Sequence, residues 1–193
     1  MGKHDALESR EGNVKGITII AAGLVLALSA GPAFATQDAA HDLAAESFAD
    51  LKQLVGVWRQ ADKPQSPLRI RFSLTAGGTV LVEEWLRGDQ PHSLTLYHRD
   101  GPDLLATHYC PQGNQPRLIA SFPTTGKALQ LNFRDATDLD AAQESHLVQL
   151  GFAFTGPDRM TRAETYREGG TDEASELHLV REQPTDGEPG RLR

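Results

Sequence analysis

Short segments of alternating apolar and polar residues, joined by glycine-containing turns, dominate the chain from residue 57 to residue 181. In the segment 68–75, for example, every second residue from Leu68 onward is apolar up to Leu74. An alternation of period two is typical of a strand that buries one face and exposes the other. Turns as short as Gly77-Gly78 join antiparallel neighbours in hairpins. The pattern therefore predicts an all-β fold.

Ten segments are expected to form strands. They cover residues 57–60, 68–75, 79–87, 93–98, 104–110, 117–122, 128–134, 145–155, 159–167 and 174–181. No helical crossover separates them in the sequence, which argues against a parallel α/β sheet. A flat sheet of this many hairpins would leave two long unpaired edges, and closure removes them. We therefore expect a closed antiparallel up-and-down barrel of about ten strands, preceded by one short N-terminal helix.

The N-terminal part of the chain has the pattern of an export signal. Lys15 precedes an apolar run over residues 17–28, and the triplet Ala33-Phe34-Ala35 follows. A positive residue, an apolar stretch and a small-x-small ending are typical of a secretory signal peptide. We expect a signal peptide over 1–35, cleavage after Ala35, and a periplasmic or secreted product that no membrane holds after cleavage. The alternative is an uncleaved anchor helix.

The remaining chain is expected to form one domain with short flanking segments. Residues 36–55 contain an amphipathic helix from about Asp42 to Leu54, which we expect to cap the barrel. Residues 56–182 are expected to form the barrel itself. The segment 183–193 is rich in proline and glycine and is predicted to be a disordered tail.

Charge and cysteine content narrow the classes of function. The chain of 193 residues carries a formal net charge of −7, which argues against a nucleic-acid partner because phosphates require a basic face. The single cysteine, Cys110, excludes an internal disulfide and any site with several cysteine ligands. The histidines follow no zinc-binding spacing, so no metal is predicted. The sequence does not indicate an oligomeric state.

Polar residues within the predicted strands are candidates for a site inside the barrel. Glu83 and Glu84 are adjacent, so one of them points inward, and we predict that it is Glu83. An inward carboxylate could hold a ligand donor, act as a base, or pair with an interior Arg or Tyr. His108 is also expected to line the barrel. The length of the preceding turn decides whether Tyr97 or His98 shares its face.

Arg117 follows a loop that contains Gly113 and Pro116. Its guanidinium is suited to clamp a carboxylate or phosphate at a barrel mouth. The alternative is a loop braced by bonds between side chains and backbone. The predicted ligand-binding residues are thus Glu83, Tyr97, His108 and Arg117.

Two groups of residues resemble a known family. The tripeptide Gly56-Val57-Trp58 resembles the Gly-x-Trp signature of lipocalins and other calycins. The second group looks like an uncharacterised bacterial family of exported lipocalin-like barrels, and it comprises Tyr97-His98, Asp100-Gly101, Thr107-His108-Tyr109-Cys110, Gly113-Asn114-Gln115-Pro116-Arg117 and Asp135-Ala136-Thr137. The resemblance implies a calycin-type barrel. In such a barrel Trp58 is expected to plug one end, while Gly56 permits a tight turn.

A more distant similarity links the chain to the haem-binding nitrobindins. Their signature extends Gly-x-Trp with two further glycines, whereas this chain has Arg59-Gln60-Ala61-Asp62 at that point. No cofactor is therefore predicted, and haem stays as an alternative.

These features favour an exported barrel that binds a small, partly apolar molecule in its interior. Three alternatives stay open. The first is a hydrolase or isomerase that uses His108 and a carboxylate in the same cavity, and the second is a haem-binding barrel. The third is a structural or partner-binding barrel, whose interior would be filled by Phe72, Phe133, Phe152 and Phe154.

Overall fold

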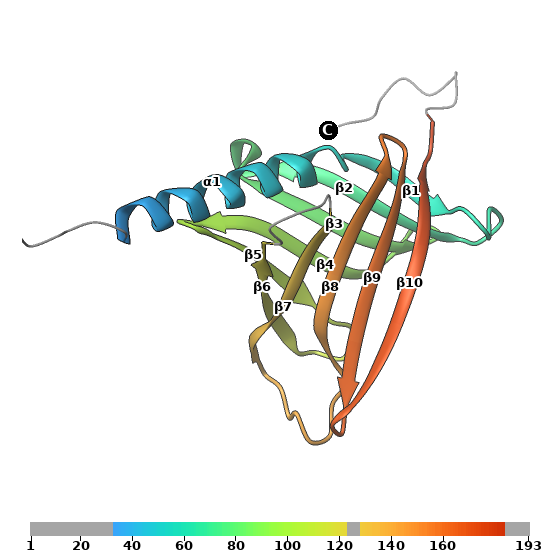
Figure 1. Ribbon diagram of the computed structural model, residues 1–193. Helices are drawn as coiled ribbons and strands as arrows, with labels where there is room; N and C mark the ends of the chain where they lie inside the picture. The colour runs from blue at the N-terminus through green and yellow to red at the C-terminus, as the bar shows by residue number, and fades with distance from the viewer. Residues whose placement is uncertain (1–32, 123–127, 184–193) are drawn as a thin grey trace, which may run out of the picture. The chain divides into compact units, whose positions relative to one another are not determined.

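A computed structural model describes residues 33–122 and 128–183 (Figure 1). Helix α1 covers Ala33–Lys52 and precedes all the strands. The strands are β1 Gly56–Gln60, β2 Leu68–Thr75, β3 Val80–Arg87, β4 Gln90–Asp100, β5 Asp103–Tyr109, β6 Gln115–Ser121, β7 Ala128–Thr137, β8 His146–Gly156, β9 Arg159–Glu168 and β10 Thr171–Arg181. A short 3-10 turn, Ala76–Gly78, joins β2 to β3.

The strands form a closed antiparallel barrel in which each strand pairs with its neighbours in sequence. The first and last strands complete the closure through the pairs Trp58–Arg181, Arg59–Val180 and Gln60–Leu179. The predicted all-β fold, the up-and-down topology and the count of ten strands are therefore confirmed. The helix is also confirmed, although it begins at Ala33 and not near Asp42.

Because successive strands run in opposite directions, their connections alternate between the two ends of the barrel. We call the end that carries α1 and the connections 76–79, 101–102 and 157–158 the sealed end. The opposite end carries the connections 61–67, 88–89, 110–114, 138–145 and 169–170, and we call it the polar end.

Helix α1 packs against β4 and β5 at the sealed end (Figure 1). Ala44, Phe48 and Leu51 are buried, and they recur at helical spacing on one face of α1. Trp58 is buried below the helix, and its indole Nε1 donates a hydrogen bond of 2.7 Å to the carbonyl oxygen of Leu54. Side chains from α1 and β1 thus close this end of the barrel.

Arg181, the last residue of β10, ties the end of the helix to the barrel. Its guanidinium stacks over the Trp58 ring at 4.3 Å and donates hydrogen bonds to the carbonyl oxygens of Gln53 and Val55 at 2.7 and 2.5 Å. Gly56 lies directly beneath this group with φ +136, and a Cβ there would lie 2.9 Å from Arg181 Nη1. The backbone conformation therefore favours glycine, and a side chain at this position would also displace the Arg181 guanidinium.

The interior near the sealed end is apolar. Its fully buried residues include Ile70, Phe72, Leu81, Leu104, Leu118, Leu131, Leu150 and Phe152. The barrel is less tightly paired between β7 and β8, which pair only over Ala128–Asn132 on the β7 side. Phe133, the next residue of β7, is 37% exposed. Phe133 is thus only partly covered, whereas the alternative of a filled interior would bury it.

Several predictions concern other parts of the chain. Most of the predicted signal peptide and the predicted tail, residues 1–32 and 184–193, lie outside the described residues. Among the described residues, no helix combines the length and the apolar character needed to span a membrane.

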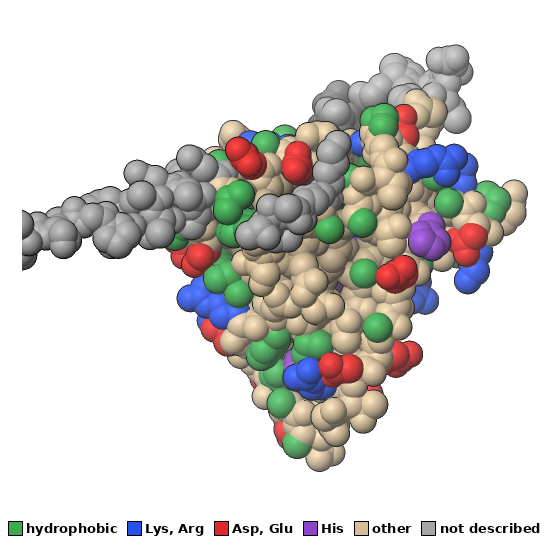
Figure 2. Space-filling view, viewed as in Figure 1, with side chains coloured by type: hydrophobic (Ala, Val, Ile, Leu, Met, Phe, Trp, Pro, Cys, Tyr) green, Lys and Arg blue, Asp and Glu red, His purple; other side chains and the backbone are tan. Residues whose placement is uncertain are grey.

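Figure 2 shows one face of the molecule, on which acidic and basic side chains are interspersed.

Candidate functional site

A cluster of polar side chains lies inside the barrel, about midway along it, where Glu83 pairs with Phe72 and Arg162 pairs with Phe152. We define the lumen cluster as Glu83 and Trp85 of β3, Tyr97 of β4, and Arg162 and Glu164 of β9. Arg162 and Glu83 form an ion pair with 2.8 Å between Nε and Oε1, and their side chains are only 1% and 0% exposed. Because β10, β1 and β2 separate β9 from β3 in the sheet, this pair crosses the lumen.

Strand alternation explains why these residues meet. Arg162 and Glu164 share the inner face of β9 with the buried Met160, and Glu83 shares the inner face of β3 with the buried Leu81. The neighbouring Glu84 points outward, where it pairs with Arg71 at 3.1 Å. The choice of Glu83 over Glu84 as the inward carboxylate therefore matches the observed geometry.

Hydrogen bonds fill most of the capacity of the lumen cluster. Glu83 Oε1 accepts from Trp85 Nε1 at 2.6 Å, and Glu83 Oε2 accepts from the Tyr97 hydroxyl. Arg162 Nη1 donates to Glu164 Oε2 at 2.5 Å, and the guanidinium lies over the Trp85 ring at 4.7 Å. Arg162 Nη2 is buried and has no hydrogen-bond partner among the described residues.

Electrostatics within the cluster keep Arg162 charged and Tyr97 neutral. Burial lowers the pKa of Arg162, but the charges of Glu83 and Glu164 outweigh it and hold this pKa above its usual value. Burial, and then the charge of Glu83, raise the pKa of Tyr97 well above its usual value. The Tyr97 hydroxyl is therefore a lasting donor to Glu83.

His108 of β5 lies next to the lumen cluster. Its Nδ1 is 2.9 Å from the Thr95 hydroxyl, and its Nε2 is 3.3 Å from the Tyr166 hydroxyl. Burial, and then the charge of Arg162, lower the pKa of His108 to about 4. The imidazole is therefore neutral at neutral pH, with one ring nitrogen donating and the other accepting.

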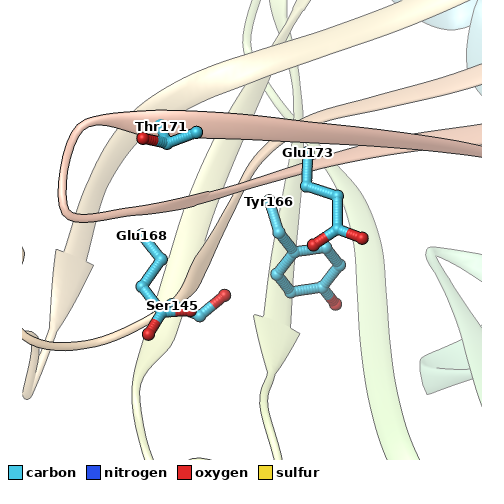
Figure 3. A pocket seen from close by; sticks show the side chains of 5 residues that line it. All are labelled: Ser145, Tyr166, Glu168, Thr171 and Glu173. Atoms are coloured by element: carbon cyan, nitrogen blue, oxygen red, sulfur yellow. The ribbon is translucent and has the colours of Figure 1, made fainter.

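Tyr166 connects this interior to the outside. Its ring lines a pocket of about 220 Å³ at the polar end, together with Ser145, Glu168, Thr171 and Glu173 (Figure 3). Tyr166 and Glu173 lie opposite each other on β9 and β10, which places them side by side in the pocket. Burial, and then the charge of Glu164, raise the pKa of Tyr166, so its hydroxyl stays protonated.

Three of the four predicted ligand-binding residues lie together. Gly101 and Pro102 alone connect β4 to β5, and this short turn puts Tyr97, not His98, on the face of His108. Glu83 contacts Tyr97 directly. The structure thus gathers Glu83, Tyr97 and His108 inside one barrel.

Arg117 does not join the other three. It lies on the outer face of β6, 52% exposed, and its Nη2 donates to Asp135 Oδ2 at 2.7 Å on the neighbouring strand β7. The adjacent Leu118 is fully buried, so strand alternation directs Arg117 outward. Trp58 lies at the sealed end, far along the barrel from the polar end.

Sequence reasoning missed Arg162, Glu164 and Tyr166. All three follow Met160 at alternate positions of β9, so the sequence contained a signal for an inward face that begins apolar and becomes polar. Their partners on β3 and β5 are remote in sequence and are set by barrel closure.

The histidine does not fit the role of a haem ligand. An axial histidine needs a free ring nitrogen and an open space for the macrocycle. His108 is 2% exposed, both of its ring nitrogens face hydroxyl groups, and the neighbouring pocket is about 220 Å³. Binding of iron at Nε2 would require displacement of Tyr166.

These features define a class of protein: a closed, ten-stranded up-and-down barrel with one end sealed by a helix and a charged cluster in its lumen. This architecture is compatible with a calycin-like fold. No protein-family model matches the chain, and a search of curated proteins finds no relative.

Proposed function

We propose that the barrel binds a small, partly apolar molecule in its lumen. The observation that carries this proposal is the lumen cluster, which keeps a guanidinium buried in the lumen with Nη2 lacking any partner among the described residues and Nε held only by the ion pair with Glu83. Buried polar groups in proteins are almost always hydrogen-bonded, so an unsatisfied donor at such a place points to a missing partner.

Energetics support a role beyond stability. Burying an ion pair costs desolvation of both charges, and apolar residues of similar size often stabilise a core as well or better. A barrel that needed only stability would be served by an apolar residue at position 162. The apolar side chains next to the cluster, such as Phe152, would supply affinity at about 25 cal/mol per Å² of apolar surface buried, while the polar groups would orient the ligand.

The pocket at the polar end limits the size of the ligand. A volume of about 220 Å³ suits a molecule of modest size. Glu164 is partly exposed and pairs with Arg162, so it links the cluster to the side of the barrel that solvent reaches. Glu83, Tyr97 and His108 belong to the proposed site, and Arg117 is left out because Asp135 already holds it.

A hydrolase or isomerase is the second candidate. The lowered pKa of His108, about 4, favours this reading because a neutral imidazole is able to accept a proton at neutral pH. The groups that face its nitrogens are the hydroxyls of Thr95 and Tyr166, not a carboxylate. Binding therefore has the stronger support.

The same proposal includes export. The apolar run over 17–28 and the Ala33-Phe34-Ala35 triplet favour a periplasmic or secreted protein, and the motif run from Tyr97 to Thr137 favours an exported lipocalin-like family. The partner is a small molecule, and the acidic net charge of −7 argues against nucleic acid.

Native mass spectrometry of protein purified from its own host tests this function. We expect a small molecule that is retained under native conditions and lost on denaturation. Ser145→Trp fills the pocket at the polar end and is expected to lose it. Gln53→Trp, at a pocket beside the sealed end, is the matched control and is expected to keep it. A mass equal to the chain alone would support the structural barrel, and a Soret band would support haem.

A further inference from the structure

Arg162 is held rigidly within the lumen. Its neighbours across the sheet are Phe152 on β8 and Leu177 on β10, and the Trp85 ring covers its guanidinium plane at 4.7 Å. With one face covered and Nη1 held by Glu164, Nη2 has a fixed position. A guanidinium donates hydrogen bonds in its own plane, so a partner for Nη2 has to lie there.

The donors and acceptors of the cluster show what that partner must supply. Glu83 already accepts a hydrogen bond from Trp85 at one oxygen and from Tyr97 at the other. Glu164 accepts one from Arg162 Nη1. The buried atoms of the cluster left without a hydrogen bond are donors: Arg162 Nη2, which has no partner among the described residues, and Nε, which has only its ion pair with Glu83. A molecule that completes the cluster therefore brings a hydrogen-bond acceptor.

Charge decides what kind of acceptor is suitable. The cluster holds two carboxylates, Glu83 and Glu164, against one guanidinium. A carboxylate or phosphate on the ligand would add a further negative charge to a buried site, and it would pass Glu168 and Glu173 at the pocket. An ammonium group offers donors only and cannot satisfy Nη2.

We propose that Arg162 recognises the ligand, and that the ligand is an uncharged molecule with a carbonyl-type oxygen that accepts a hydrogen bond from Nη2. This inference rests on the proposed function and adds the chemical class of the ligand to it. Trp85 holds the guanidinium in place from one side, and the apolar residues near the cluster contact the remainder of the ligand.

The two tryptophans provide a built-in test, because Trp85 belongs to the lumen cluster and Trp58 lies at the sealed end. Each indole N–H gives one resonance in a ¹H–¹⁵N spectrum of the full chain, and Trp58→Phe assigns them. Four probes of similar size are titrated at pH 7: acetophenone, ethylbenzene, benzoate and benzylammonium. We expect acetophenone to shift the Trp85 resonance and leave Trp58 unchanged, with weaker or no shifts from the other three probes.

Arg162→Lys supplies the second measurement. Lysine keeps the positive charge beside Glu83 but has no Nη2, so we expect acetophenone to bind about tenfold more weakly, the change that loss of one charge-assisted hydrogen bond gives. Arg181→Lys makes the same change at the sealed end and is expected to leave the affinity unchanged. If Arg162→Lys does not fold, the probe series on the unaltered protein still decides the question.

The outcomes separate this inference from the function on which it rests. Equal shifts from acetophenone and ethylbenzene would overturn the role of the carbonyl and leave a site for apolar molecules. Preference for benzoate or benzylammonium would overturn the proposed ligand class and leave a site for ions. Absence of any Trp85 shift would overturn the inference, while a co-purified molecule in native mass spectrometry would still support binding.

Discussion

Two arginines, one partly buried at the sealed end and one fully buried in the lumen, are held in different ways. Arg181 at the sealed end stacks on Trp58 and donates to Asp158 and to the backbone carbonyls that end α1. Arg162 in the lumen stacks on Trp85 and pairs with two carboxylates, yet its Nη2 has no hydrogen-bond partner in the described part of the chain. Both arginines stack on a tryptophan, but every guanidinium nitrogen has a hydrogen-bond partner only in Arg181.

This difference distinguishes a structural arginine from a candidate ligand-binding arginine. Arg181 complements the carbonyls at the end of the helix, where a positive charge is favourable. Arg162 is surrounded by side chains that hold it in place without satisfying it. We propose that the sealed end stabilises the fold and that the lumen around Arg162 is the place to look for a ligand.

The largest effect is expected from Glu83→Gln. Removal of one charge from a buried ion pair leaves the other uncompensated, so we expect the free energy of unfolding to fall by about 4 kcal/mol. Urea denaturation measures this change. Asp135→Asn, which removes a carboxylate from the exposed pair with Arg117, is the control and is expected to have no measurable effect. Equal destabilisation by the two variants would show that burial of the Glu83 pair is unimportant.

A smaller effect is expected in the pH dependence of stability. The pKa of His108 is lowered to about 4 in the folded protein, whereas an unfolded histidine titrates near its usual value of 6.5. Between these values the unfolded state binds more protons, so stability falls as the pH drops from 6.5 to 4 and His108 adds no further loss below that. We expect His108 to account for about 3 kcal/mol of this loss.

Urea denaturation of His108→Gln at pH 7 and at pH 4 tests this expectation, because the variant should lose about 3 kcal/mol less than the unaltered protein over this range. His178→Gln is the matched control. His178 contacts the Thr161 hydroxyl on the neighbouring strand as His108 contacts Thr95, but it is exposed on the outer face, so this variant controls for the loss of a histidine that contacts a threonine. A pH dependence that is the same in all three proteins would contradict the burial of a neutral His108.

The smallest of these effects is expected from Arg181→Met. Loss of the bonds from Arg181 to the carbonyls of Gln53 and Val55 should lower the free energy of unfolding by about 2 kcal/mol. The indole resonance of Trp58 should move and that of Trp85 should not. A shift of the Trp85 resonance as large as that of the Trp58 resonance would show that the sealed end and the lumen cluster are coupled.

The strands could be predicted from the sequence because each one buries a single face. Alternation in segments such as 68–75 fixed both the element and its inward residues, and the structure has β2 at Leu68–Thr75. The same rule predicted that only one of the adjacent Glu83 and Glu84 points inward. It would also have directed Arg117 outward, since Leu118 and Leu131 show which face of that hairpin is buried.

The site itself could be predicted only in part. Tyr97 and His108 lie on adjacent strands, so a two-residue turn decides that they share a face. The pairing of Glu83 with Arg162 depends on two strands that come together only when the barrel closes, and no local pattern encodes it. The helix began earlier than predicted, because the first apolar residue of the amphipathic face did not mark its start.

The most direct test of the account is a crystal structure of the protein purified from its own host. The account predicts density for a molecule other than water in the lumen, with an oxygen within hydrogen-bond distance of Arg162 Nη2 and none beside Arg181. A lumen in which only protein atoms and water surround Arg162 would contradict it.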